Sequence, residues 1–344
     1  MAPLISVLMP VRNAAGFVVD AVNSVISQSL PKFELLVLDD ASDDDTAARV
    51  EGIRDDRVRV IRHDEPQGIA SLLNEGIESA SCDLVARMDG DDRMLKKRLS
   101  VQYKRMMEDT SLAAVGTAGR YFGREFMVRV SPPIGVDCVR AFTVFDNPLL
   151  HPTVMFRKSI LRKHGLSYRS EFSKSEDFDL WERLVQVAPV DNIDVVTMHL
   201  RVHSASVTGS SGSLMEEQTR SILSKGLARL GIETDPEQLD FHRRVGHGCR
   251  MKTRNELVRA MEWIDSLAEA NSRFSNYPER GFREAVDVVR FRICRNSAAS
   301  LGMDAWRIWK KDRCSDYKVR AEDIAWLLAG IMRHILTGQR ANAD

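Results

Sequence analysis

Three carboxylates follow an apolar segment at residues 84–88 within the next four positions, at Asp89, Asp91 and Asp92. Gly90 separates the first two and permits a tight backbone turn. Carboxylates this close repel one another unless a cation lies among them, and their hard oxygens are ligands for a divalent metal that also binds a diphosphate. A solvated acidic turn is the alternative for an isolated Asp-x-Asp, so the surrounding chain must decide between a metal site and a turn.

A second pair of acids, Glu176 and Asp177, begins a segment whose apolar residues recur at helical spacing. In the first turn of a helix, capping alone explains one carboxylate. The same position also favours the ionised form, because the helix dipole and backbone N–H groups lower the pKa of a carboxyl there. An acid that is ionised at neutral pH suits a general base. The pattern leaves capping and catalysis open.

The first hundred residues contain the elements that would position the acidic loop. Strand-like apolar segments alternate with segments of helical spacing, which predicts a parallel sheet with right-handed crossovers. The segments with strand character are 4–9, 33–38, 58–61 and 84–88. Ligands of parallel sheets bind beyond the carboxyl ends of the strands. We therefore expect loops 10–13, 39–40 and 89–92 to share one crevice.

Two common nucleotide-binding motifs are missing from the sequence. No Gly-x-Gly-x-x-Gly follows the first strand, and no Walker lysine loop occurs anywhere in the chain. Ordinary dinucleotide-binding and phosphate-loop sites are therefore not expected, and a bound metal is expected to hold the phosphates instead.

Beyond residue 110 the regular alternation is lost. Shorter strand-like segments lie near 112–116, 126–130 and 193–202. A serine- and glycine-rich segment at 203–213 is interpreted either as a lid over a bound nucleotide or as a linker. From residue 214 onward the apolar periodicity is helical.

This pattern predicts two domains. The first is expected at 1–213, with a nucleotide-binding half at 1–110 and an acceptor half with the lid loop at 111–213. An α-helical C-terminal region is expected at 214–344.

Composition restricts the partners and the compartment. With 49 basic and 49 acidic residues the formal net charge is zero, so no nucleic-acid partner is expected. The five cysteines are odd in number, scattered and without Cys-x-x-Cys spacing, which predicts reduced thiols and a cytoplasmic location. No signal peptide is recognised, and the apolar run at 324–332 is too short to span a bilayer. A soluble or peripheral protein is expected.

Six segments taken together resemble the family 2 glycosyltransferases of the GT-A fold, over roughly residues 4–208. They are 6–13, 37–46, 86–92, 151–153, 176–181 and 201–203. The resemblance implies an α/β, Rossmann-like, mostly parallel sheet with flanking helices, followed by the helical C-terminal region. It also favours function over a solvated turn for Asp91 and over capping for Asp177.

The resemblance implies a set of donor-binding residues. Pro10 and Arg12 would border the nucleotide base, and Asp40 would accept a hydrogen bond from a uracil or thymine imide. Asp89 would face the ribose or a metal-bound water, and Asp91 would bind the Mn²⁺ or Mg²⁺ that bridges the diphosphate. Arg12 departs from the family pattern, since an aromatic residue commonly stacks on the base there.

The resemblance also implies residues on the acceptor side. Asp177 would be the catalytic base, and His203 would reach the metal or the diphosphate as the lid closes. His151 is a weaker candidate for the donor or acceptor pocket.

The implied reaction is inverting, metal-dependent transfer of a hexose from a UDP- or dTDP-sugar to a saccharide or lipid-linked acceptor in surface polysaccharide synthesis. The Gln-x-x-Arg-Trp signature of processive members is absent, which predicts transfer of one sugar or a few. Two alternatives remain, a sugar-phosphate nucleotidyltransferase and a non-catalytic nucleotide-sugar-binding protein. The first ordinarily needs a glycine-rich basic loop after the first strand, and the second has no need of an aspartate at position 177.

The C-terminal helices are the least defined part. Between Trp306 and Arg340, eight basic residues stand against four acidic ones, a net charge of +4. Basic and aromatic residues on amphipathic helices favour an anionic surface, so weak peripheral contact with the inner face of the cytoplasmic membrane is one expectation. The other is that residues Ile324, Leu327, Leu328, Ile331 and Ile335 pack onto the catalytic domain or a second subunit, giving a homodimer.

Overall fold

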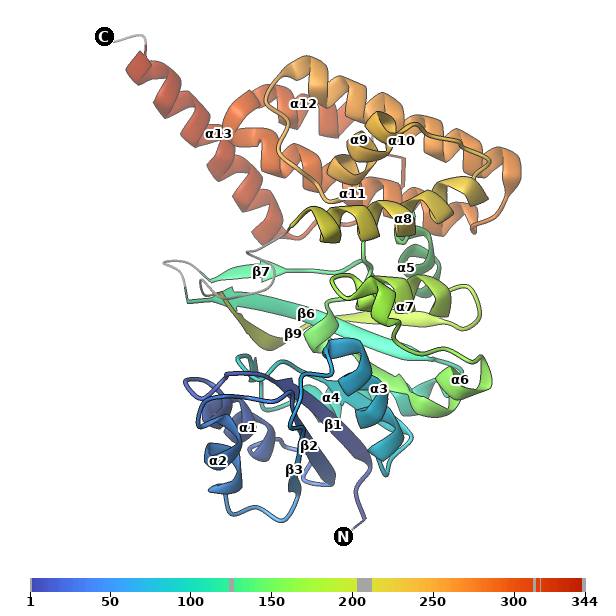
Figure 1. Ribbon diagram of the computed structural model, residues 1–344. Helices are drawn as coiled ribbons and strands as arrows, with labels where there is room; N and C mark the ends of the chain where they lie inside the picture. Colours follow the sequence, from blue (N-terminus) through green and yellow to red (C-terminus); the bar gives the residue numbers. More distant parts are fainter. Residues whose placement is uncertain (1, 124–126, 203–211, 312–313, 316, 342–344) are drawn as a thin grey trace. The chain divides into compact units, whose positions relative to one another are not determined.

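The computed structural model describes residues 2–123, 127–202, 212–311, 314–315 and 317–341. These residues form two compact units (Figure 1). The first unit comprises Met1–Val136 and Asn147–Gln218, and the second comprises Asp137–Asp146 and Thr219–Asp344. The boundary predicted after residue 213 lies at the first residue of α8 (Ser213–Arg229) and stays a proposal, as do the two halves of the first domain.

The first unit is built on a sheet whose order is β3-β2-β1-β4-β8-β6-β9-β5, with β7 paired to β6, among the residues described. Its first four strands are β1 (Ile5–Val11), β2 (Phe33–Asp39), β3 (Val58–Arg62) and β4 (Leu84–Arg87). They run parallel to one another, and Ile5 of β1 lies opposite Phe33 of β2 on one side and Leu84 of β4 on the other. The parallel sheet predicted from the alternating pattern is therefore confirmed.

Helices cover both faces of this parallel half (Figure 1). They are α1 (Val18–Ile26), α2 (Thr46–Glu51), α3 (Ile69–Ser79) and α4 (Arg98–Glu108). Side chains alternate along a strand, so Ile5, Val7 and Met9 share one buried cluster with residues of α1, α2 and α4. On the other face, Gly76 of α3 lies against Leu8 and Leu38. β1, β2 and β4 are buried on both faces, which explains their continuous apolar character, whereas the edge strand β3 is partly exposed.

The second half of the sheet is mixed. Its strands are β5 (Arg93–Met94), β6 (Ala114–Phe122), β7 (Val128–Val130), β8 (Met155–Arg157) and β9 (Val190–Arg201). The short helices of this region are α6 (Lys158–Lys163), α7 (Glu176–Leu184), η1 (His151–Thr153) and η2 (Ser170–Phe172). Strand β8 joins β4 and β6 antiparallel, whereas β9 lies parallel to β6 and antiparallel to β5. Because β5 directly follows the acidic loop, this pairing brings the end of β9 to that loop.

The second unit is helical. Its elements are α5 (Val136–Phe142), most of α8, α9 (Pro236–Gly246), α10 (Arg254–Phe274), α11 (Glu279–Leu301), α12 (Met303–Lys311) and α13 (Ala321–Ala341). Helix α11 is central, and its Phe282 contacts Phe145 with ring centroids 5.8 Å apart. A Cβ on Gly246 of α9 would lie 1.8 Å from the Phe145 carbonyl oxygen, so only glycine permits this approach. The segment Asp137–Asp146 is thus part of the helical core.

No disulfide joins the five cysteines, all of which are described, and this agrees with the expected reduced thiols. Among the described helices, none combines the length and apolar character needed to cross a bilayer.

Candidate active site

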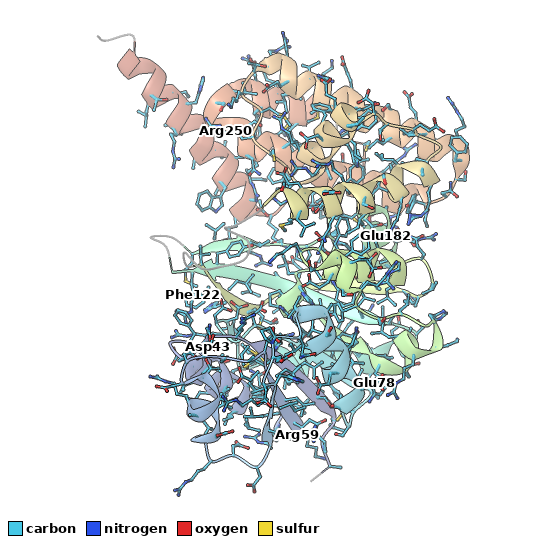
Figure 2. All side chains as sticks on the ribbon, viewed as in Figure 1. Asp43, Arg59, Glu78, Phe122, Glu182 and Arg250 are labelled. Carbon is cyan, nitrogen blue, oxygen red and sulfur yellow. The ribbon has the colours of Figure 1, made fainter. Side chains whose placement is uncertain are left out.

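The loops after β1 and β2 are tied to each other by side-chain hydrogen bonds. The backbone N–H of Asn13 donates to Ser42 Oγ at 3.0 Å, and that of Asp43 (labelled in Figure 2) donates to Asn13 Oδ1 at 2.9 Å. Asn13 adopts φ 51°, a left-handed conformation that asparagine tolerates well. These bonds fix the loops that carry Arg12 and Asp40 at the carboxyl edge of the sheet, where the sequence predicted a crevice.

Asp40 is held by the start of α3. Its carboxylate accepts the N–H of Gln67 at 2.6 Å and the N–H of Gly68 at 3.3 Å. Gly68 has φ 81°, which favours glycine at this position. Pro10 is buried in β1, whereas Arg12 is exposed directly after it. The roles of Pro10, Arg12 and Asp40 toward a base stay predictions.

The acidic loop after β4 gathers three carboxylates. One oxygen from each of Asp89, Asp91 and Asp92 lies within 4.8 Å of the others. A Cβ on Gly90 would lie 2.4 Å from Val11 Cγ1, so the close approach of β1 requires glycine here. Clustered carboxylate oxygens are the hard donor set that Mg²⁺ or Mn²⁺ accepts, and the residues present fit such an ion.

A buried arginine compensates the charge of this loop. Arg87, the last residue of β4, is 5% exposed and donates to both oxygens of Asp89, with Nη1 at 2.6 Å and Nη2 at 2.5 Å. Desolvation raises the pKa of Asp89, and the Arg87 charge opposes that rise. The fully buried Arg98 donates from Nη2 to the Arg87 carbonyl at 2.7 Å. The Arg87 guanidinium therefore supplies part of the positive charge that these carboxylates need.

The end of β9 closes the other side of the loop. The N–H of Arg201 donates to Asp92 Oδ1 at 2.7 Å, and its Nε donates to the Asp91 carbonyl at 2.8 Å. The Arg201 guanidinium lies 4.6 Å from the ring centroid of Phe17 and 4.5 Å from that of Phe122, labelled in Figure 2. Burial, followed by the charges of Asp89 and Asp91, raises the pKa of Asp92 to about 8. The end of β9 is thus anchored to the acidic loop by two hydrogen bonds from Arg201.

Asp177 lies in the first turn of α7, as predicted. Its Oδ2 accepts from Asn147 Nδ2 at 2.7 Å, and its Oδ1 accepts the N–H of Phe178 at 2.7 Å. Burial raises the pKa of Asp177, and these two donors oppose the rise. The expectation that the helix start would keep this pKa low is wrong, because desolvation outweighs the amide donors. Burial and the neighbouring Asp177 also raise the pKa of Glu176, to about 8.

His151 lies beside the proposed base. Its Nδ1 is 4.0 Å from Asp177 Oδ2, and its Nε2 is 3.0 Å from the Tyr168 hydroxyl. Burial and the Arg87 charge lower the His151 pKa well below its usual value, so this imidazole is neutral at physiological pH. The position of His151 near Asp177 is consistent with an acceptor-side role, which stays a prediction. His203 and positions 204–211 of the predicted lid lie outside the described residues.

Four residues of this site received no role from the sequence: Arg87, Asn147, Tyr168 and Arg201. Arg87 had a usable signal, because an arginine inside an otherwise apolar strand must find a counter-charge. Asn147 and Tyr168 gave none, since both reach the site only through tertiary packing. The Arg87 charge acts on Asp89, Glu176 and Asp177 alike. The two acidic groups recognised separately in the sequence therefore share one electrostatic environment.

Comparison with known proteins gives a consistent result. Residues 6–165 match the family described as "Glycosyl transferase family 2". The O-antigen biosynthesis glycosyltransferase WbnJ of Escherichia coli is 30% identical over 216 residues, covering 60% of this chain and 83% of WbnJ.

Two groups of solved structures share the fold. Staphylococcus aureus TarS 1-349 in complex with UDP-GlcNAc aligns with TM-score 0.56 and 17% identity, over 97% of this chain and 92% of that one. The mannosyltransferase PcManGT from Pyrobaculum calidifontis, in complex with GDP-Man and Mn²⁺, aligns with TM-score 0.53 and 16% identity, over 97% and 88%. These likenesses confirm the GT-A architecture expected from the sequence.

Proposed function

Because the chain belongs to glycosyl transferase family 2, we propose that it transfers one hexose or a few, with inversion, from a nucleotide-diphosphate sugar to a saccharide or lipid-linked acceptor in polysaccharide synthesis. One observation carries this proposal: Arg87 connects the acidic loop to the environment of Asp177. The name of WbnJ and the ligand of TarS favour surface polysaccharide and a UDP-sugar. The cytoplasmic side of the membrane is the proposed place of reaction.

Asp177 is proposed to act on the acceptor. It removes the proton from an acceptor hydroxyl as that oxygen forms a bond to the anomeric carbon, and the bond to the diphosphate breaks on the opposite face. Asn147 and the Phe178 amide orient the carboxylate. Because burial raises the pKa of Asp177, this carboxylate is a stronger base than an exposed aspartate, which improves its match to neutral pH. A single displacement of this kind inverts the anomeric centre.

The donor is proposed to bind across the three loops at the carboxyl edge of the sheet. Asp40, Pro10 and Arg12 would contact the base, and Asp91 with Asp89 would hold Mn²⁺ or Mg²⁺. A divalent ion held there supplies Lewis-acid stabilisation of the departing diphosphate. Arg201 and Arg87 fix the loop that presents these carboxylates.

The product released by the reaction tests the proposal. The protein should release UDP from a UDP-sugar in the presence of Mn²⁺ and a suitable acceptor. Release of pyrophosphate would instead identify a nucleotidyltransferase. Release of neither product, across a broad donor panel with acceptors supplied, would favour a non-catalytic nucleotide-sugar-binding protein.

We predict that metal and donor binding are linked. The acidic loop should bind Mn²⁺ weakly by itself, because a diphosphate must supply the remaining oxygen ligands. Calorimetry should therefore show UDP affinity falling by about tenfold or more, about 1.4 kcal/mol, when a chelator replaces Mn²⁺. Asp91→Ala should remove this metal dependence, whereas Asp83→Ala, at an exposed residue directly before β4, should keep it. Equal UDP affinity with and without chelator would refute a metal-bridged donor.

The last helix, α13, is proposed to contact an anionic membrane. Leu327 and Ile331 are buried in the core of the helical unit itself, and not on the catalytic domain as one expectation had it. Four other apolar side chains, Leu328, Met332, Ile335 and Leu336, are each at least 40% exposed. Their spacing places them along an apolar stripe of the helix. Arg333 is exposed within the same turns, as suits an anionic surface.

Vesicle flotation tests this membrane contact. Binding to vesicles with anionic lipid should be present at low salt and fade near about 0.5 M salt. The double variant Leu328→Ser, Met332→Ser should bind roughly tenfold more weakly, because burial of those side chains is lost. Met107→Ser, which replaces an equally exposed residue of α4, is the matched control. The alternative is a homodimer interface. It would be identified if the protein did not bind vesicles at low salt and sedimented with a doubled mass, and if the double variant sedimented as a monomer.

A further inference from the structure

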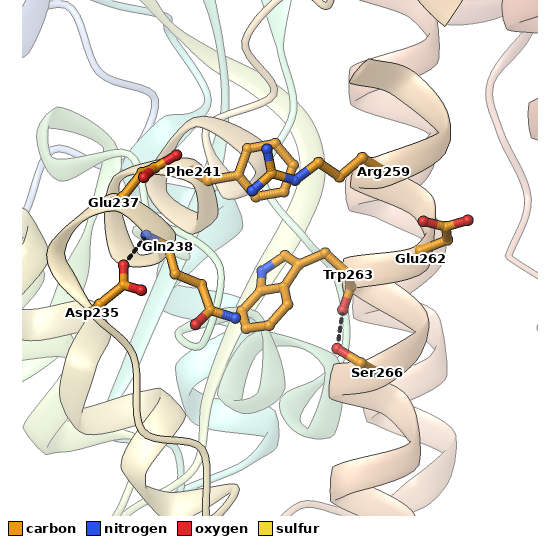
Figure 3. A pocket seen from close by; sticks show the side chains of 8 residues that line it. All are labelled: Asp235, Glu237, Gln238, Phe241, Arg259, Glu262, Trp263 and Ser266. Carbon is orange, nitrogen blue, oxygen red and sulfur yellow. Dashed lines mark hydrogen bonds between the residues drawn. The ribbon is translucent and has the colours of Figure 1, made fainter. Parts of the chain in front are cut away.

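A hollow of about 430 Å³ lies between α9 and α10 in the helical unit (Figure 3). None of its lining residues belongs to the site described above. They are Asp235, Glu237, Gln238, Phe241, Arg259, Glu262, Trp263 and Ser266. The hollow therefore combines two aromatic rings with carboxylates, an amide, a hydroxyl and one guanidinium, and it is polar enough to recognise a hydrogen-bonding ligand.

The indole ring of Trp263 is held in place by a buried relay. Trp263 Nε1 donates to His242 Nδ1 at 3.0 Å, and His242 Nε2 donates to the Val144 carbonyl at 2.8 Å. Burial lowers the pKa of His242 to about 4, so the neutral tautomer that makes both bonds persists at physiological pH. The partly buried ring of Trp263 thus has an orientation that is fixed before any ligand arrives, which reduces the entropic cost of binding.

The second aromatic ring carries a cation. The Arg259 guanidinium lies 4.5 Å from the Phe241 ring centroid (Figure 3), which orients its donors beside the hollow. Asp235 accepts the N–H of Gln238 at 2.7 Å and caps α9, and Ser266 donates to the Trp263 carbonyl at 2.7 Å. Donors and acceptors therefore surround the two rings on rigid helices.

The charge of the hollow selects among ligands. Three carboxylates, Asp235, Glu237 and Glu262, stand against the single Arg259, a formal net charge of −2 from one positive and three negative groups. Phosphorylated, sulfated and nucleotide ligands are repelled by such a lining. A compact organic cation would compete with Arg259 for the Phe241 face. A neutral ligand with apolar faces and many hydroxyl groups satisfies both constraints.

We propose that this hollow binds a neutral saccharide of the class that serves as glycosyl acceptor. The C–H face of a pyranose ring packs on Trp263, and its hydroxyl groups bond with the Gln238 amide beside that ring and donate to Glu237 (Figure 3). The inference rests on the proposed function, because a saccharide is expected as a ligand only if the protein transfers sugars to a saccharide acceptor. It assigns the helical unit a role in holding the acceptor.

Saturation-transfer NMR on the full chain tests the inference, with neutral tetrasaccharides of glucose and of N-acetylglucosamine as probes. At least one should bind at millimolar concentration, with quenching or enhancement of tryptophan fluorescence. Phe241→Ala and Gln238→Ala should each weaken that binding by about tenfold. Alanine favours a helix, so Gln238→Ala keeps the fold even if Phe241→Ala loosens it. Phe274→Ala, which removes an exposed aromatic ring of α10 outside the hollow, should bind as the wild type does.

Three results would overturn the inference: no tetrasaccharide binds, binding is unchanged in both hollow variants, or spermidine binds at the hollow and the sugars do not. UDP release from donor and acceptor is measured on the same wild-type sample. A protein that releases UDP but binds no tetrasaccharide keeps the proposed function and loses this site. A protein that binds tetrasaccharide at the hollow but releases no UDP from any donor keeps the site and loses the proposed function.

Discussion

Asp177→Asn should lower turnover by roughly 10²–10⁴-fold and leave donor binding near the wild-type value, because general-base assistance is lost while the donor loops are untouched. Asparagine preserves the size of the side chain, and its carbonyl oxygen can still accept from Asn147 or from the Phe178 amide. The measurement is steady-state UDP release with calorimetric UDP affinity on the same variant. A fall in kcat without a change in donor affinity is the expected signature.

Glu176→Gln is the matched control for this prediction. Because the pKa of Glu176 is raised to about 8, this acid is mostly protonated near neutral pH, and glutamine mimics that form. Turnover of the control should remain within about threefold of the wild type. A large loss in Glu176→Gln together with an active Asp177→Asn would move the base to Glu176.

The pH profile follows from the same carboxylate. Turnover requires ionised Asp177, and burial raises the pKa of this group. As pH falls through that raised value the base becomes protonated, so the acidic limb of the kcat profile should lie above the range of an ordinary aspartate.

Arg87→Met should lower the free energy of unfolding by about 3 kcal/mol at neutral pH. This value is at the lower end of the range for breaking a buried ion pair, because Asp89 retains some contact with solvent. Methionine fills a similar volume without charge, so the loss reports the missing cation. Arg162→Met is the control, because Arg162 and its partner Glu78 form an ion pair at the surface, with side chains 52% and 65% exposed. For this variant we expect the free energy of unfolding to fall by less than about 1 kcal/mol. Urea denaturation at constant temperature measures both variants.

The sign of the pH dependence makes the Arg87 prediction specific. Without the guanidinium, the folded-state pKa values of Asp89, Glu176 and Asp177 rise further above those of the unfolded chain. The folded variant then binds more protons than the unfolded chain, so its stability falls as pH rises. The difference in unfolding free energy between the wild type and Arg87→Met should therefore be larger at about pH 8 than at about pH 5. A difference independent of pH would mean that Arg87 acts through packing alone.

The sequence was informative where chemistry and fold are local. β1, β2 and β4 are continuous apolar segments, and the residues after them lie at one sheet edge because parallel strands leave no other arrangement. β9 was recognised as a strand, but its pairing with β5 and β6 depends on contacts between residues far apart in the chain. For the same reason Arg201 and Asn147 could not be assigned to the site. Asp177 was placed correctly, yet its pKa depends on burial, which periodicity does not report.

In the helical unit, the helical periodicity expected from residue 214 onward is clearest in the long helices. α10 and α11 span many turns and carry regular apolar periodicity, and α10 begins with a capping box at Thr253 and Glu256. α9 and α12 are shorter and lie between polar or basic residues. The sequence of α5 does not predict that it packs with helices that follow it by 80 or more positions, because this contact depends on tertiary packing alone.

The path of the chain limits how the protein can be dissected. Segment Asp137–Asp146 lies in the middle of the catalytic half of the sequence, yet its residues Phe142, Val144 and Phe145 are buried in the helical core. A shortened gene that stops at Gln218 would therefore produce a polypeptide with these apolar side chains uncovered, a template for aggregation. Separate production of the catalytic unit requires a second cut, in which a short polar turn replaces Asp137–Asp146. By the same reasoning, the helical unit could not have been acquired as a simple C-terminal fusion without the sheet domain also adapting an internal segment to it.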